Sequence, residues 1–311
     1  MPALLECDDL AKRFGETQAV DGLSFQVNSG EIYGLLGPNG AGKTTAISMI
    51  CGLLKPDRGS VHVDGHPMAT ESRACKKVLG VTPQEIAVYE ELSGWENLIA
   101  WGRIAGLKGP ELRQRCEEIL KTLSLSDRAK DRVKAYSGGM KRRLNIGLSL
   151  LHRPKLLLLD EPTVGIDPQA RANILTFVQD LAKSGVGVLY TTHYLDEAEN
   201  LCDRIAILDH GKLLAEGSLE SLRERLGEEH IFQLEGSFEG VDPSSWPGFT
   251  ERFRVMRQSE KALTVAGGKD EDPAETLRSL LTFPTGATNV TYRQPSLNEV
   301  FLQLTGKDLR E

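Results

Sequence analysis

The sequence predicts an α/β fold built on a parallel β-sheet, followed by a small α+β module. Three observations lead to this prediction. Short apolar runs of strand length alternate with stretches of helical periodicity in the first part of the chain. One of these runs is followed by a glycine-rich loop and an apolar helix. Beyond about residue 228 the apolar runs become short, and glycine, proline and serine gather between residues 236 and 248.

The first predicted elements surround the glycine-rich loop. Apolar and polar residues alternate at 23–27, as they do in a half-buried strand. The apolar run 32–36 predicts a buried strand that ends at the loop, and residues 44–50 predict the helix that follows it. The run 61–63, which precedes Asp64-Gly65, predicts an edge strand that enters a turn.

The middle of the chain has a helical pattern and then returns to alternating strands and helices. Between about residues 90 and 151, apolar residues recur at helical spacing, for example Leu98, Trp101 and Ile104. Four consecutive leucines at 156–159 predict a strand that is buried on both faces, which is typical of a parallel sheet. The pattern also predicts a helix at 168–183, a strand at 186–191, a hairpin of 205–208 with 212–214, and a helix at 218–226.

A domain boundary is predicted near residue 228, because one hydrophobic core rarely serves all of a chain of 311 residues. The predicted domains are 1–228 and 229–311. The second domain carries nine basic and twelve acidic residues between 231 and 311, so it is not an electrostatic arm. Its predicted strands are 231–234, 262–265 and 290–292, and its predicted helices are 273–281 and 297–304.

Composition and charge exclude several classes of protein. The 37 basic and 44 acidic residues give a net charge of −7, whereas nucleic-acid binders usually show a basic stripe. The one compact basic cluster, Lys141-Arg142-Arg143, is interpreted as a solvated helix face. No apolar run approaches the roughly 18–20 residues of a membrane helix, and the first residues lack the pattern of a signal peptide. We therefore expect neither a secreted nor an intrinsic membrane protein, although docking on a membrane protein remains possible.

The five cysteines are scattered and never form a CxxC pair. This pattern indicates reduced cytosolic thiols and no zinc site.

The glycine-rich loop matches the phosphate-binding pattern G-x-x-x-x-G-K-[ST] in full. Its residues are Gly37, Pro38, Asn39, Gly40, Ala41, Gly42, Lys43 and Thr44, and Thr45 follows them at the predicted phosphate site. Glycines allow backbone N–H groups to curl around phosphate oxygens, and the following helix directs its positive end at the same anion. Lys43 would reach the β- and γ-phosphates, and the hydroxyl of Thr44 would bind Mg²⁺.

Two acids follow the strand at 156–159. Asp160 is placed to hold Mg²⁺, and Glu161 would face an attacking water molecule as a general base. The alternative is an acid pair at a solvent-exposed strand end. The phosphate loop upstream favours the catalytic interpretation.

Residues 136–140 have the sequence Tyr-Ser-Gly-Gly-Met. This stretch, called the signature sequence below, resembles the LSGGQ signature motif of ABC transporter ATPases. Tyr136 stands in place of Leu and Met140 in place of Gln, while the Ser-Gly-Gly centre is intact. Because the Ser-Gly-Gly centre that would bind phosphate is intact, the two departures concern the subgroup of the family more than the ATPase activity.

Other motifs of the same family are found at the expected places between about residues 4 and 226. Gln84 corresponds to the Q-loop glutamine, residues 164–167 to the D-loop with Asp167 at its end, and His193 to the switch histidine. Phe14 stands where the family stacks an aromatic ring on adenine. Taken singly these residues have simpler interpretations, since Phe14 could be a core residue, Asp167 could cap the next helix, and His193 could be a surface or core histidine.

The resemblance implies the fold of an ABC-type P-loop NTPase, with a helical subdomain at about 90–152 and an antiparallel β-subdomain. It also implies ATP and Mg²⁺ as cofactors, with Thr44, Gln84 and Asp160 as metal ligands. Two such domains, in a homodimer or a dimer with a similar ATPase, would enclose two ATP molecules. Each γ-phosphate would then contact Lys43 of one subunit and Ser137, Gly138 and Gly139 of the other. The catalytic residues implied are Glu161, His193 and Gln84.

The last helix indicates a branch of the family. Residues 294–306 resemble the end of ATPases that serve ABC-2-type exporters, which include daunorubicin-resistance-like drug exporters and sodium exporters. The same residues also fit a plain packing helix, with Leu297, Val300, Phe301 and Leu304 on one face. The module would be regulatory or would stabilise the dimer, and the sequence does not distinguish these roles.

The sequence therefore predicts an ATPase subunit on the cytoplasmic face of the cell membrane. It would power export through a separate integral membrane permease of the ABC-2 type, and no nucleic-acid partner is expected. The alternatives are a soluble ABC ATPase that acts on ribosomes or DNA, and a catalytically idle nucleotide-binding scaffold. Relatives that act on ribosomes or DNA usually carry two ATPase domains or a coiled-coil arm, and this chain has one phosphate loop and no heptad arm.

Overall fold

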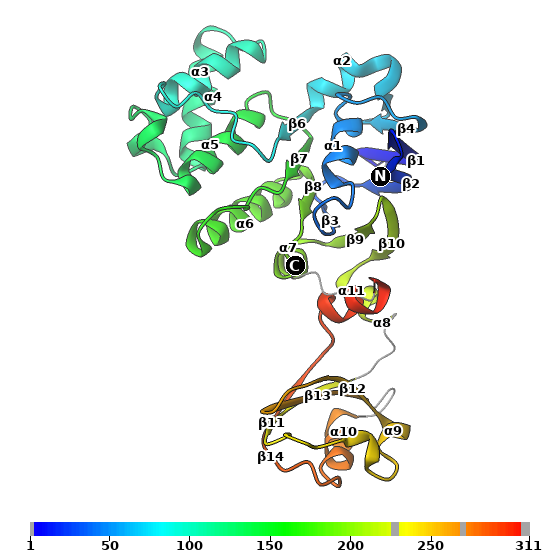
Figure 1. Ribbon diagram of the computed structural model, residues 1–311. Helices are drawn as coiled ribbons and strands as arrows, with labels where there is room; N and C mark the ends of the chain where they lie inside the picture. Colours follow the sequence, from blue (N-terminus) through cyan, green and yellow to red (C-terminus); the bar gives the residue numbers. More distant parts are fainter. Residues whose placement is uncertain (1–2, 225–229, 268–271, 306–311) are drawn as a thin grey trace. The chain divides into compact units, whose positions relative to one another are not determined.

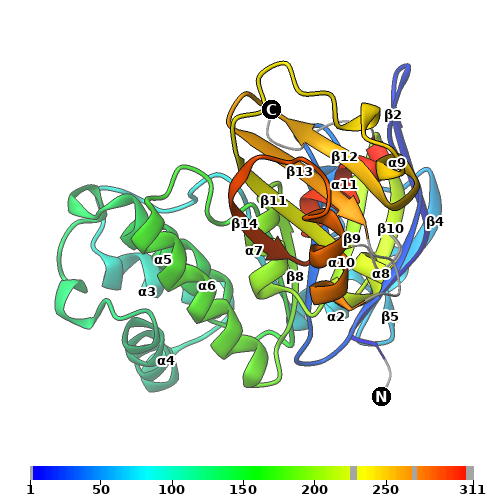
Figure 2. The same ribbon diagram turned by 90° about the horizontal axis from the view of Figure 1, so that it is seen from below.

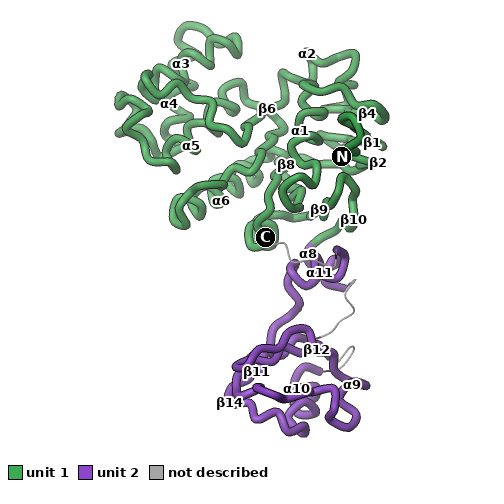
Figure 3. The backbone as a smooth tube through the Cα atoms, in the orientation of Figure 1, with its two compact units in different colours: residues 1–218 green, residues 219–311 purple. Residues whose placement is uncertain are grey.

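The computed structural model describes residues 3–224, 230–267 and 272–305 (Figure 1). The chain divides into two compact units, Met1–Ser218 and Leu219–Glu311 (Figure 3). The predicted boundary near residue 228 falls on residues 225–229, which lie outside the described ones. The helix α8 (Leu219–Glu224), which the sequence pattern places in the first domain, belongs to the second unit because it packs against α11 (Leu297–Thr305).

A six-stranded sheet forms the centre of the first unit. Five parallel strands lie in the order β9-β3-β8-β7-β6, and β10 pairs with β9 in the antiparallel direction. All residues of β3 (Ile32–Leu36) and β7 (Leu156–Asp160) are buried. The predicted parallel sheet is therefore confirmed. The other strands are β6 (Leu79–Thr82), β8 (Gly187–Thr192), β9 (Arg204–Asp209) and β10 (Lys212–Gly217).

An antiparallel sheet shares one hydrophobic core with the central sheet and α1 (Lys43–Ile50). Its strands are ordered β2-β1-β4-β5. The rings of Phe25 and Tyr33, one from each sheet, stack with centroids 5.0 Å apart. The edge assignment of residues 61–63 was wrong, because the two-residue strand β5 lies outside β4. The strands are β1 (Leu5–Phe14), β2 (Thr17–Val27), β4 (Arg58–Val63) and β5 (His66–Pro67).

Helices α3 (Gly94–Ile104), α4 (Gly109–Thr122) and α5 (Gly138–Ser149) form the predicted helical subdomain. The first of them begins with a capping box, in which Ser93 and Glu96 satisfy each other's backbone N–H groups. Among the apolar residues at helical spacing, Leu98 is buried, whereas Ile104 is 70% exposed.

The signature helix α5 runs beside α6 (Pro168–Lys183) in both views of the ribbon (Figures 1 and 2). The remaining helices of this unit are α2 (Met68–Val78), α7 (Leu195–Leu201) and the 3₁₀ turns Ser126–Arg128 and Val133–Ala135. Across the described ranges, none of the helices combines the length and the apolar character needed to cross a membrane.

The second unit is the predicted α+β module. Its antiparallel sheet has the order β12-β13-β11-β14, and one face packs a core that includes Phe232, Phe249, Leu263 and Leu280. The strands are β11 (His230–Gly236), β12 (Phe253–Gln258), β13 (Ala262–Gly267) and β14 (Ala287–Arg293), and the helices are α9 (Phe249–Arg252), α10 (Pro273–Leu280), α11 and the 3₁₀ turn Pro243–Ser245.

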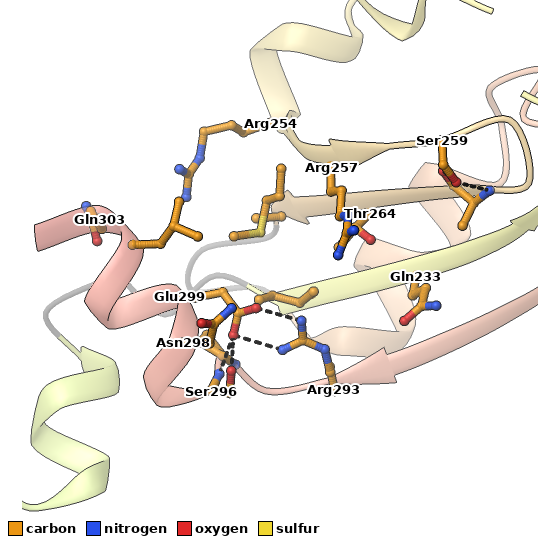
Figure 4. A pocket seen from close by; sticks show the side chains of 16 residues that line it. Gln233, Arg254, Arg257, Ser259, Thr264, Arg293, Ser296, Asn298, Glu299 and Gln303 are labelled. Atoms are coloured by element: carbon orange, nitrogen blue, oxygen red, sulfur yellow. Dashed lines mark hydrogen bonds and ion pairs between the residues drawn. The ribbon is translucent and has the colours of Figure 1, made fainter. Parts of the chain in front are cut away.

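The opposite face of this sheet borders a cavity of about 860 Å³ that α11 closes at one side (Figure 4). At its edge Arg293 donates two hydrogen bonds to Glu299, of 2.7 and 3.0 Å, and the backbone N–H of Ser296 donates a third of 2.7 Å. Burial raises the pKa of Glu299, but these hydrogen bonds and the charge of Arg293 outweigh it and lower the pKa to about 2. The ion pair therefore ties α11 to the end of β14.

This pair predicts an acid-dependent stability of the second unit. Because the folded pKa lies below the ordinary value of 4.5, the contribution of ionised Glu299 is complete above about pH 4.5 and is lost as the pH falls toward 2. The melting temperature of Glu299→Gln should lie below that of the wild type at pH 7, and the difference should shrink below pH 4.5. Fluorescence of Trp246, with Trp95 and Trp101 replaced by Phe, reports on this unit alone. Glu251→Gln, at an exposed acid, is the control, and a difference independent of pH would contradict the assignment.

Candidate nucleotide-binding site

The phosphate loop connects β3 to α1, and its shape requires glycine at two positions. A side chain at Gly37 would place its Cβ 2.2 Å from the carbonyl oxygen of Leu208. Gly42 has a φ of +105°, and its Cβ would lie 2.3 Å from the carbonyl oxygen of Ala19. The loop can therefore close against its neighbours only with these glycines. Within it Ala41 is buried, Pro38 and Thr45 are half-buried, and Asn39, Gly40 and Thr44 are exposed.

Lys43 is 4% exposed and lies at the start of α1. Its Nζ donates hydrogen bonds of 2.6 Å to the carbonyl of Gly37 and 2.9 Å to that of Pro38. The same Nζ lies 3.1 Å from Oε1 of Glu161. The lysine is therefore held at the centre of the loop and paired with the carboxylate that follows β7.

Glu161 is the point at which several predicted residues meet. It is 6% exposed and has a φ of +43°, a left-handed conformation that non-glycine residues rarely adopt. Gln84 donates a hydrogen bond of 3.3 Å to Oε2, and His193 Nδ1 lies 3.3 Å from Oε1. The structure thus brings Lys43, Gln84, Glu161 and His193 together, although they are far apart in the sequence.

Asp160 lies at the end of β7 and is 3% exposed. Thr191, at the end of the neighbouring strand β8, donates a hydrogen bond of 2.7 Å to Oδ1 of Asp160. The backbone N–H of Glu161 donates to the same hydroxyl at 3.0 Å. Thr191 therefore holds the carboxylate of Asp160 and the backbone of Glu161, a role that the sequence pattern did not indicate.

The signature sequence begins α5. Ser137 caps this helix by accepting a hydrogen bond of 3.3 Å from the N–H of Met140, and both Ser137 and Gly138 are exposed. Gly139 is buried, and a Cβ there would lie 2.5 Å from the Cβ of Ala170 on α6. Within the described part of the chain, no hydrogen bond or ion pair joins Ser137, Gly138 or Gly139 to the phosphate loop.

The departure from the family pattern at Tyr136 has a structural cause. The side chain is buried, and its hydroxyl donates a hydrogen bond of 2.7 Å to the carbonyl of Arg128. It also lies against Gly94, where a Cβ would be 2.3 Å from the hydroxyl oxygen. The tyrosine therefore anchors the start of the signature sequence within the helical subdomain.

The structure decides whether Asp167 caps a helix and whether Phe14 is a core residue. Asp167 does cap a helix, because its Oδ1 accepts a hydrogen bond of 2.9 Å from the N–H of Ala170 in α6. Phe14 is 51% exposed and is therefore no core residue. The ammonium group of Lys12 lies 5.9 Å from the centre of its ring.

The interpretation of Lys141-Arg142-Arg143 as a solvated helix face was wrong for Arg142, which is 2% exposed. Its guanidinium group donates five hydrogen bonds of 2.6–3.1 Å to backbone carbonyls, namely those of Pro83, Gln84, Asp160, Glu161 and Pro162. Burial lowers the pKa of Arg142 to about 10, so the group stays charged at neutral pH. Arg142 therefore joins α5 to the two segments that carry Gln84 and Glu161.

A second buried group that the sequence did not single out is Glu197 of α7, which is 1% exposed. Its carboxylate accepts hydrogen bonds from the hydroxyls of Thr163, Tyr190 and Thr192, at 2.5, 2.9 and 2.8 Å. Thr192 precedes His193, and its carbonyl accepts a hydrogen bond of 3.2 Å from the N–H of Gly37. The carboxylate thus joins Thr163 to Thr192, and the backbone of Thr192 contacts the phosphate loop.

A sequence model of the ABC transporter family matches residues 20–164. The linearmycin resistance ATP-binding protein of Bacillus subtilis is 41% identical over 316 residues, which cover 99% of this chain and 100% of that protein. The chain belongs to the ABC transporter ATP-binding family. A second member, the Nod factor export ATP-binding protein I of Rhizobium sp. strain N33, is 39% identical over 304 residues, or 96% of each chain.

Solved structures of ABC transporter ATPases share the fold. The ATP-binding subunit of one ABC transporter has a TM-score of 0.65 and 33% identity, and covers 72% of this chain and 93% of that one. A dimeric ATP-binding cassette in a post-hydrolysis state, bound to ADP and phosphate, has a TM-score of 0.62 and 26% identity, covering 69% and 98%. As a member of the ABC ATPase family, this chain binds and hydrolyses ATP.

Proposed function

We propose that this ABC ATPase is the energy-supplying subunit of an exporter and that it acts on a separate integral membrane permease at the cytoplasmic face. The observation that carries the proposal is the similarity to the linearmycin resistance and Nod factor export proteins over nearly the whole chain, the second unit included. A role on ribosomes or DNA has no such support. Lys141 pairs with Glu90 at 2.6 Å and Arg142 is buried, so the one compact basic cluster does not offer a free basic surface.

The residues around Glu161 suit ATP hydrolysis in this proposal. Lys43 and the N–H groups of the loop would bind the phosphates, and Glu161 would accept the proton of the attacking water molecule. His193, beside the same carboxylate, would help to orient that water molecule. The donor set of hydroxyl, amide and carboxylate oxygens at Thr44, Gln84 and Asp160 fits Mg²⁺, which would balance charge on the phosphates.

A dimer would complete each ATP site. Ser137 and Gly138 present a hydroxyl and a helix N-terminus to solvent, which suits an anion, yet no contact links them to the phosphate loop of their own chain in the described residues. The γ-phosphate bound by one chain would therefore meet the signature sequence of another. The dimeric assembly of the ATP-binding cassette named above supports this arrangement.

A groove of about 950 Å³ in the first unit suits the permease. Trp101, Ile104 and Leu107 give it an apolar wall, and Ile104 is 70% exposed. Pro83 and Ala87, on either side of Gln84 in the sequence, line it as well, and Gln84 contacts Glu161. The groove is also lined by basic residues and one acid. Arg115 and Arg153 pair with Glu118, and the others are Arg73, Lys76, Lys77 and the acid Glu111. An apolar permease segment flanked by acids would fit here and could act on the catalytic carboxylate through Gln84.

Purification from the membranes of the producing cell tests this function. The wild-type chain should bring down an integral membrane protein in stoichiometric amount, and Ile104→Asp should lose it while hydrolysing ATP at the wild-type rate in isolation. Leu53→Asp is the matched control, because Leu53 is an equally apolar residue, 79% exposed, that does not line the groove. A wild-type chain that yields ribosomes, or no membrane protein, would contradict the proposal.

A further inference from the structure

The side chain of Arg142 connects the signature helix to the backbone of Glu161 in the same chain. Helix α5 begins at the signature sequence and carries Arg142 on its second turn. The guanidinium group reaches the end of β7, where it donates 2.8 Å to the carbonyl of Glu161 and 2.6 Å to that of Pro162. Arg142 lies only five residues beyond the N-cap Ser137, and a helix is a rigid element, so a shift at its first residues is transmitted to Arg142.

The same side chain also holds the segment that contains Gln84. It donates hydrogen bonds of 2.9 Å to the carbonyl of Pro83 and 2.8 Å to that of Gln84. Gln84 in turn donates to the carboxylate of Glu161. A displacement of Arg142 therefore changes the position of Glu161 by two routes, through its backbone and through the glutamine.

Arginine is well suited to this position. Its planar guanidinium offers five N–H donors, and here it makes five hydrogen bonds to carbonyls of two separate segments. Lysine offers only three donors from a single atom and cannot reach both segments in the same way. The neighbouring Arg143 makes a different connection, because it donates 2.7 Å to the carbonyl of Leu123 inside the helical subdomain.

We infer that Arg142 is a positioning residue that couples the two ATP sites of the dimer. The inference rests on the dimer proposed above. ATP bound to the partner's phosphate loop contacts Ser137 and Gly138 of this chain, and α5 with Arg142 transmits that contact to Glu161, which acts on the chain's own ATP. Occupancy of one site thereby sets the geometry of the catalytic carboxylate in the other.

The test is the dependence of the hydrolysis rate on ATP concentration in the full chain. The wild type should show a Hill coefficient approaching 2, the number of sites, and Arg142→Gln a coefficient near 1 with a lowered kcat. Binding of a fluorescent ATP analogue to the monomer should be unchanged. Arg142→Lys should fall between them, and it serves as the readout if Arg142→Gln does not fold. Arg143→Gln, on the same helix, should keep the wild-type coefficient.

Two results would overturn the inference, and they differ in what else they reject. The first result is that the wild type and the Arg142 variants all form dimers with ATP in sedimentation and have the same Hill coefficient. Arg142 would then have a structural role without coupling the sites, whatever its effect on kcat. If the wild type itself stays monomeric with ATP and shows a coefficient of 1, the proposed dimer fails and the coupling fails with it.

Discussion

Replacing Glu161 by glutamine should lower the rate of ATP hydrolysis by about 10²–10⁴-fold, the usual contribution of a general base. Glutamine preserves the size of the side chain and can still accept from Gln84, but it cannot take a proton from water. The loss should lie in kcat, because Lys43 and the loop N–H groups, which are the proposed phosphate-binding groups, stay in place. Single-turnover hydrolysis of radiolabelled ATP measures the rate, and sedimentation should show an ATP-bound dimer that no longer dissociates.

Glu85→Gln is the matched control for this result. Glu85 is an exposed acid beside Gln84, so its neutralisation changes the charge nearby without touching the site. It should hydrolyse ATP at the wild-type rate. A Glu161→Gln variant that also turns over at that rate would show that another group accepts the proton.

Replacing Lys43 by glutamine should weaken ATP binding by roughly 10- to 150-fold, which corresponds to the loss of one charge-assisted hydrogen bond of about 1.5–3 kcal/mol. The change also removes the ammonium group that lies 3.1 Å from Oε1 of Glu161. Buried carboxylate charge next to the phosphates would then remain unbalanced, which acts in the same direction. Equilibrium binding of a fluorescent ATP analogue at fixed Mg²⁺ gives the affinity.

Lys121→Gln, at an exposed lysine of α4, controls for the loss of one positive charge and should bind ATP as the wild type does. Because Lys43 is proposed to bind ATP and Glu161 to act in the chemical step, Lys43→Gln should change the affinity and Glu161→Gln should change kcat. If Lys43→Gln binds ATP with the wild-type affinity, the phosphates do not bind at Lys43.

The sequence predicted the parts of the site that depend on local pattern. A buried strand followed by a glycine-rich loop and a helix is a continuous signal, and so is the leucine run that ends at Asp160 and Glu161. The convergence of Gln84 and His193 on Glu161 came from the family resemblance, and the geometry agrees with it. The positions of these residues along the chain would not by themselves have indicated that contact.

Arg142 and Ile104 show where local pattern fails. Arg142 lies in a run of three basic residues, a pattern that usually indicates a solvent-exposed helix face. Its acceptors, however, are backbone carbonyls up to 59 residues away in the sequence, and only folding brings them close to it. Ile104 has the spacing of a core residue, yet it is largely exposed because no described element covers that side of α3. Periodicity identifies an apolar face but does not say whether the same chain or another one covers it.

The left-handed backbone at Glu161 has a consequence for the energetics of the whole domain. A non-glycine residue in that conformation costs about 1–3 kcal/mol, and here it also places a second carboxylate beside buried Asp160. A residue chosen for stability alone would be glycine or asparagine, which adopt positive φ readily. The domain thus gives up part of its folding free energy at the residue proposed as the general base, which is a trade of stability for activity at a single residue.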